Sequence, residues 1–112
     1  IVLAGFSQGG AITPQTGLRH AERLAGLMVL SSYLPLAETL PAEASAANRS
    51  TPIFMAHGTE DPVIDIELGR RSQQRLVELG YPVEWHEYPM PHSVCLQEIE
   101  DISRWLQRVL AA

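Results

Sequence analysis

The ten residues at the start of the chain leave few options for folding. An apolar run, residues 1–4, leads directly into Gly5-Phe6-Ser7-Gln8-Gly9, which matches the pattern G-x-S-x-G. This pattern needs a strand that stops abruptly, a serine on a strained turn, and a helix that begins at once. Glycines two residues on either side of Ser7 are expected to leave room for that turn. The first N–H groups of the helix would then point at charge that develops beside Ser7.

Two later loops carry an acid and a histidine. An apolar segment, residues 52–56, runs into a loop that contains Asp61, and a strand-like segment, residues 83–88, precedes His92. Each interval is long enough for one or two strand–helix units, so all three side chains can lie at carboxyl ends of parallel strands. A serine, a histidine and an acid together provide a nucleophile, a general base and a group that orients the base. The order Ser, Asp, His is the one found in α/β-hydrolases.

Each member of this set also has an ordinary structural interpretation. Ser7 could cap the following helix, and Asp61 could be a turn residue before a proline. Glu60 and Asp65 are alternative acids near the same loop. Asp61 is preferred because it lies at the turn beyond the strand.

The other polar candidates are weaker. We interpret the remaining histidines as structural or surface residues: His20, His57 and His86. The single cysteine, Cys95, is interpreted as a small buried hydrophobic residue rather than a nucleophile. A metal site built from His57, Asp61 and His92 is disfavoured, because no pattern such as H-E-x-x-H is present.

Strand and helix patterns alternate along the chain. Strands are expected at residues 1–4, 25–31, 53–56 and 83–88, and helices at residues 8–21, 65–79 and 96–110. This alternation predicts a parallel sheet with right-handed crossovers. Residues 32–50 have no clear period and are expected to form a surface excursion with a helical turn near 42–47. The two later helices are expected to carry apolar stripes, formed by Leu68, Leu76, Val77 and Leu79 and by Leu96, Ile99, Ile102, Leu106 and Leu110.

Three motifs carry a resemblance to a known family: residues 5–10 (GFSQGG), 57–63 (HGTEDPV) and 88–92 (YPMPH). The chain is similar to the carboxylesterase/phospholipase family of α/β-hydrolases, which includes acyl-protein thioesterases and lysophospholipases. The resemblance extends over essentially the whole chain. Two prolines depart from the family pattern: Pro91 stands where many relatives have glycine, and Pro14 should kink the helix after Ser7.

This resemblance implies an α/β-hydrolase fold, a mostly parallel sheet with helices on both faces. Such folds usually need a larger sheet than 112 residues supply. Residues 1–112 are therefore expected to be a single domain that lacks its N-terminal half, including one oxyanion-hole donor.

The resemblance also implies a serine esterase without a metal or cofactor. Ser7 would attack an ester or thioester, His92 would act as the base, and Asp61 would orient His92. The Gln8 N–H would contact the oxyanion. Expected substrates are short- to medium-chain acyl esters, lysophospholipids or acylated proteins. Phe6, Leu34 and Met90 are the predicted apolar neighbours of the substrate.

Composition agrees with a cytoplasmic enzyme. The net charge is −5 and the eight basic residues are all arginines without a cluster, which argues against nucleic-acid binding. No apolar run approaches the roughly 20 residues that span a bilayer. A homodimer is left open. The alternative hypothesis is a truncated or non-catalytic α/β-hydrolase-like module that binds an acyl ligand or a partner.

Overall fold

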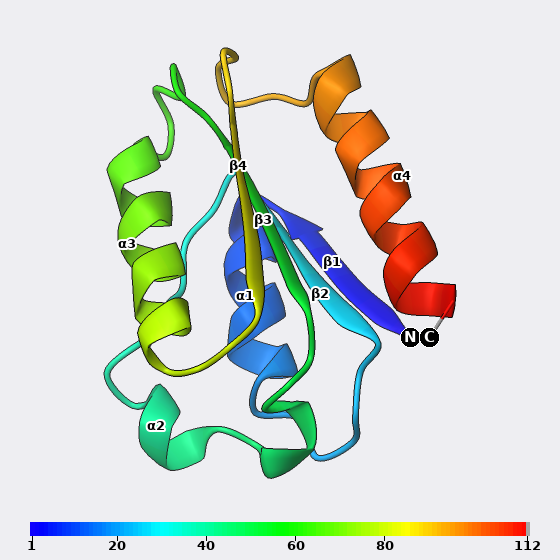
Figure 1. Cartoon of the computed structure of the whole chain (residues 1–112). Helices are drawn as coiled ribbons and strands as arrows, with labels where there is room; N and C mark the ends of the chain where they lie inside the picture. Colours follow the sequence, from blue (N-terminus) through cyan, green and yellow to red (C-terminus); the bar gives the residue numbers. More distant parts are fainter. Residues whose placement is uncertain (112) are drawn as a thin grey trace.

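Four apolar segments form one parallel sheet in the computed structural model, which describes residues 1–111. The strands are β1 (Val2–Phe6), β2 (Gly26–Leu30), β3 (Ile53–Gly58) and β4 (Val83–Tyr88), and they lie in the order β1-β2-β3-β4. All three pairs are parallel. Every carboxyl end therefore lies at the same edge of the sheet (Figure 1), as the alternating pattern predicted.

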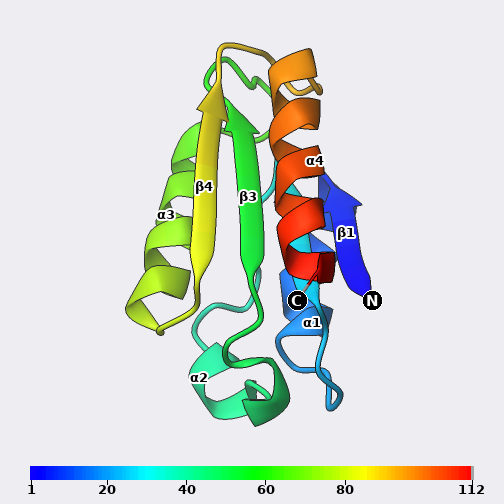
Figure 2. The same ribbon diagram turned by 45° about the vertical axis from the view of Figure 1, so that its right-hand side comes forward.

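Helices cover both faces of this sheet, as expected for the predicted fold class. They are α1 (Gln8–Gly17), α2 (Leu40–Glu43), a 3₁₀ turn η1 (Ala46–Asn48), α3 (Ile66–Glu78) and α4 (Leu96–Ala111). α1 and α3 pack on one face and α4 packs on the other (Figures 1 and 2). Alternation along β3 divides the core: Ile53 and Met55 join the cluster under α3, whereas Phe54 and Ala56 join the cluster under α4. None of the helices within residues 1–111 is long and apolar enough to cross a membrane.

The helix after Ser7 ends earlier than predicted. α1 stops at Gly17 rather than near residue 21, and His20 lies exposed beyond it. Pro14 stands inside the helix and lacks the N–H that would bond to the Gly10 carbonyl.

The segment between β2 and β3 is tied down by one buried polar side chain. The Asn48 side-chain oxygen accepts from the Leu24 N–H at 2.8 Å and from the Thr51 hydroxyl at 2.9 Å. Its amide nitrogen donates to the carbonyls of His20 and Glu22 at 2.9 and 2.8 Å. The predicted surface excursion is therefore anchored, because a buried amide with all these bonds satisfied holds its loop in one conformation.

Helix α3 begins and ends as its sequence predicts. The Asp65 carboxylate accepts from the Glu67 N–H at 2.9 Å as an N-cap, and Gly80 has a φ of 91° after the last turn. The buried residues are Ile66, Gly69, Ser72 and Leu76. The prediction was wrong for two members of the apolar stripe, because Leu68 and Val77 are 45% and 49% exposed.

Helix α4 buries a different face from the one that its hydrophobic pattern indicates. Its buried residues are Glu98, Asp101 and Trp105, while Ile102 and Leu106 are only partly buried. Three residues of the predicted stripe are exposed: Leu96, Ile99 and Leu110. The Trp105 ring lies against Gly26, where even a Cβ would come within 2.6 Å of it. This large ring decides which side of the helix faces the sheet.

Candidate active site

Ser7 lies on a strained turn between β1 and α1. Its φ is 58° and its ψ is −119°, a conformation that non-glycine residues rarely adopt. The Ser7 N–H donates to the Leu30 carbonyl at 2.9 Å, which ties the turn to β2. A Cβ at Gly5 would lie 2.1 Å from the Gly9 carbonyl oxygen, so only glycine fits there. A Cβ at Gly9 would meet nothing within 4 Å, so the expected crowding on that side was wrong.

The Ser7 side chain does not cap the helix that it precedes. It occupies the N-cap position but accepts no hydrogen bond from the first turn. Its Oγ instead lies 2.9 Å from Nε2 of His92. The residues come from opposite ends of the chain, and the loop after β4 brings them together.

Asp61 lies on the other side of His92. Its Oδ2 is 2.6 Å from the His92 Nδ1, and its Oδ1 accepts from the N–H groups of Val63 and Ile64 at 2.8 and 2.9 Å. The competing acids have other positions, since Asp65 caps α3 and Glu60 is exposed. Of the three acids, only Asp61 reaches His92.

The electrostatics of Asp61 favour its charged form. Burial by itself would raise the pKa of Asp61, but the hydrogen bonds from His92, Ile64 and Val63 outweigh it and leave this pKa below its ordinary value. An ionised Asp61 accepts a hydrogen bond from the Nδ1–H of His92, and this tautomer leaves Nε2 free to accept from the Ser7 hydroxyl. The Phe6 ring packs on the His92 ring with a centroid distance of 4.8 Å and limits its tilt.

A shallow groove of about 620 Å³ lies beside Ser7. Its lining combines the elbow with side chains of two loops and α3: Phe6, Ser7, Gln8, Tyr33, Val63, Ile64 and Leu68. Gln8 opens α1, so its backbone N–H is one of those without an acceptor inside the helix. Leu34 and Met90 lie in the two core clusters and do not line this groove. Of the three predicted substrate neighbours, the structure therefore brings only Phe6 to it.

Val63, Ile64 and Leu68 were missed as groove residues by sequence reasoning, whereas Tyr33 belongs to residues 32–36, which their place after a strand predicts as a loop in contact with the acyl group. The signal for the other three was available in part, since each lies within three residues of Asp61 or Asp65. Leu68 was instead assigned to the buried stripe of α3, because helical periodicity does not distinguish a groove from a core.

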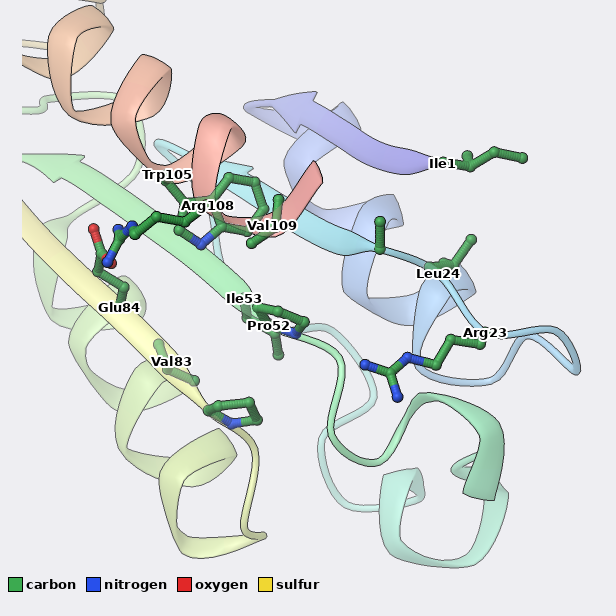
Figure 3. A pocket seen from close by; sticks show the side chains of 12 residues that line it. Ile1, Arg23, Leu24, Pro52, Ile53, Val83, Glu84, Trp105, Arg108 and Val109 are labelled. Atoms are coloured by element: carbon green, nitrogen blue, oxygen red, sulfur yellow. The ribbon is translucent and has the colours of Figure 1, made fainter. Parts of the chain in front are cut away.

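A larger hollow, about 780 Å³, lies at the opposite edge of the sheet (Figure 3). It is lined by the amino ends of the strands and by α4, and Arg108 donates to Glu84 across it at 2.6 Å. It contains no serine, cysteine or histidine. The smaller groove at Ser7 is therefore the candidate site, because chemistry requires a nucleophile and a base more than volume.

Within residues 1–111, no three histidine, cysteine, aspartate or glutamate side chains are grouped so that they could hold a metal ion. Cys95 is half-buried and packs against the cluster under α4.

Comparison with known proteins gives the family of the chain. A family profile described as Phospholipase/Carboxylesterase matches residues 1–110. The chain belongs to this family. The resemblance inferred from its three motifs is therefore confirmed.

Relatives in this family carry names that refer to acyl groups. The chain is 47% identical over 111 residues to acyl-protein thioesterase 1 of Neurospora crassa, covering 95% of this chain and 44% of that protein. It is 42% identical over 113 residues to acyl-protein thioesterase 1 of Gibberella zeae, covering 98% and 48%. The crystal structure of Arabidopsis thaliana SOBER1 superposes with a TM-score of 0.92 at 33% identity, covering 97% and 52%. The chain thus spans about half the length of these relatives.

Proposed function

We propose that this protein is a serine hydrolase of carboxylic esters or thioesters, with Ser7 as nucleophile, His92 as base and Asp61 as the orienting acid. One observation carries the proposal: a continuous hydrogen-bonded chain runs from the Ser7 Oγ through both ring nitrogens of His92 to Asp61. A nucleophile within 3 Å of a base, and an acid within 3 Å of the other side of that base, are the geometric mark of nucleophilic acyl transfer.

The reaction follows from these positions. The Ser7 Oγ attacks the carbonyl carbon while its proton passes to Nε2 of His92, and the ionised Asp61 stabilises the resulting imidazolium. The Gln8 N–H donates to the tetrahedral oxyanion, and one such donor is worth about 3 kcal/mol. His92 returns the proton to the leaving thiol or alcohol. Water then repeats the sequence on the acyl-enzyme and frees the acid.

The proposed substrates are S-acylated proteins, with lysophospholipids and simple acyl esters as alternatives. The names of the fungal relatives support the first class. The groove supports an acyl chain in general, because Phe6, Tyr33, Val63 and Leu68 border it with apolar surface beside Ser7. Rates on an acylated peptide, a lysophospholipid and a nitrophenyl ester, compared as kcat/KM, will rank the three. A homodimer and a cytoplasmic location stay predictions.

We also propose that the working domain includes a further N-terminal half. Two observations support it: the chain spans about half the length of its relatives, and β1 is an edge strand within the four-stranded sheet. An unpaired parallel strand presents N–H and C=O groups that another strand can use.

A fluorophosphonate probe tests the proposal directly. Intact-mass analysis should show one adduct on the wild-type protein and none on Ser7→Ala. The matched control is Ser103→Ala, which removes an exposed serine on α4 and should keep the adduct. Ester turnover should fall about 10³-fold or more in Ser7→Ala, because the triad works as a unit. An adduct on Ser7→Ala, or turnover that survives this change, would show that the assignment is wrong. Ligand binding without turnover in the wild type would favour a non-catalytic module.

A further inference from the structure

His57 is a fully buried histidine that the reaction described above does not use. It lies near the end of β3 and is 0% exposed. Its Nε2 is 2.7 Å from the carbonyl oxygen of Ile64. A carbonyl oxygen can only accept, so this distance places the ring proton on Nε2.

The other ring nitrogen, Nδ1, lies against helix α3. Nδ1 has no hydrogen-bond partner within residues 1–111, and a Cβ on Gly69 of α3 would come within 2.9 Å of it. The ring is therefore held against a glycine that leaves just enough space for it. Nε2 therefore makes the one hydrogen bond of this ring within the described residues.

One residue, Ile64, is hydrogen-bonded to both His57 and Asp61. Ile64 accepts from His57 with its carbonyl and donates to the Asp61 Oδ1 with its N–H at 2.9 Å. In addition, the His57 Nε2 lies 3.4 Å from the Asp61 Oδ2, the oxygen that accepts from His92. His57 thus lies close both to the turn that holds Asp61 and to the carboxylate itself.

We propose that His57 is a positioning residue, whose Nε2–H fixes the turn of residues 61–64 and so aims Asp61 at His92. This inference rests on the proposed function. In the absence of the Nε2–H, the Ile64 carbonyl loses its donor and the turn is free to shift. A displaced Asp61 stabilises the His92 imidazolium less, because the attraction between them depends on distance and hydrogen-bond geometry.

Two substitutions separate this role from simple packing. His57→Leu fills much of the same space without a donor, whereas His57→Gln keeps an N–H near the Nε2 position. We expect His57→Leu to lower kcat about 10- to 100-fold, the scale of a displacement near 1 Å, with KM within about twofold of wild type. The acid limb of the kcat/KM profile should move to lower pH, because a less well placed Asp61 stabilises the His92 imidazolium less. His57→Gln should recover most of kcat and return the acid limb close to its wild-type position.

The matched control is His86→Leu, which removes a histidine from the neighbouring strand. His86 pairs with Ala56 in the β3–β4 register and stacks on Phe54 in the cluster under α4, away from Asp61. We expect its kcat and pH profile to match the wild type. A loss in His57→Leu that came only from reduced folding would leave the pH profile of the remaining folded protein unchanged, and would contradict the positioning role.

A second readout needs no turnover. In ¹H NMR of the protein, the proton between His92 Nδ1 and Asp61 should give a far-downfield signal that disappears in Asp61→Asn. His57→Leu should shift this signal upfield or broaden it, and His57→Gln should keep it. An unchanged signal in His57→Leu, or a Gln variant no better than Leu, would overturn the inference. A wild-type protein that shows this signal and its dependence on His57, yet hydrolyses no ester, would contradict the proposed function alone.

Discussion

Asp61 and Glu98 lie on the two sides of His92 in the chain, and both carboxyl groups are buried. The side chain of Asp61 receives donors from His92, Val63 and Ile64. Neither carboxylate oxygen of Glu98 has a well-formed hydrogen bond within the described residues 1–111. The consequences are opposite, since the pKa of Asp61 lies below its ordinary value whereas burial raises the pKa of Glu98 to about 7, against a smaller effect of the Cys95 backbone N–H. Hydrogen-bond donors, rather than burial, decide which carboxyl group keeps its charge.

The two carboxyl groups should differ most in their effect on kcat, and this is the largest effect that we expect. Asp61→Asn should lower kcat by about 10³- to 10⁴-fold, because an amide favours the wrong His92 tautomer. Glu98→Gln should change kcat no more than a few-fold, since its carboxyl group bonds to no residue of the triad. Steady-state kinetics on one ester compares the two variants. Undiminished activity in Asp61→Asn would move the acid to Glu60 or Asp65.

The free energy of unfolding should depend on pH through Glu98. The sign of this dependence is opposite to that expected from Asp61. The pKa of Glu98 rises from 4.5 to about 7 on folding, so stability from the protonated form is fully present below pH 4.5 and is lost as the pH rises through 7. The loss is at most about 3–4 kcal/mol at 1.36 kcal/mol per pKa unit. Glu98→Gln should remove this slope between pH 4.5 and 8, and denaturant unfolding at several pH values measures it. Parallel curves for the two proteins would show that Glu98 stays charged or finds a partner.

A third carboxyl group, Asp101, resembles Asp61 in having a hydrogen-bond donor. Removal of this donor should make it more like Glu98. The Tyr88 hydroxyl donates to it at 2.6 Å, and this bond is the main reason that the pKa of Asp101 lies below its ordinary value. Tyr88→Phe should cost about 1–2 kcal/mol of unfolding free energy and raise the pKa of Asp101. Denaturation and NMR titration of the carboxyl carbon measure the two effects. Tyr81→Phe is the control, because the Tyr81 hydroxyl makes no hydrogen bond to residues 1–111. It should lower the unfolding free energy clearly less than Tyr88→Phe. Equal losses would rule out the Tyr88–Asp101 bond as the cause.

The two amphipathic helices show where sequence patterns reach their limit. Both helices were predicted near their observed bounds, because caps, Gly80 and the period of 3.6 residues are local signals. The buried faces were predicted less well. In α4 the line of Glu98, Asp101 and Trp105 faces the sheet, and Ile99 and Leu110 do not. Hydrophobicity alone predicts the reverse, since it does not include the fit of the Trp105 ring against Gly26 or the bond from Tyr88 to Asp101.

The sequence by itself determined the parallel sheet, the strained turn at Ser7 and the order of the three loops that bear Ser7, Asp61 and His92. These follow from local rules: apolar runs separated by helices, glycine where the backbone crowds, and motifs at strand ends. Only the tertiary structure decided that Asp61 rather than Glu60 or Asp65 reaches His92, that Leu34 and Met90 lie in the core, and that His57 bonds to the Ile64 carbonyl. Those outcomes depend on distances of about 3 Å between segments far apart in the chain. The strength of a hydrogen bond falls steeply with distance and angle, so spacing along a sequence cannot determine which bonds form.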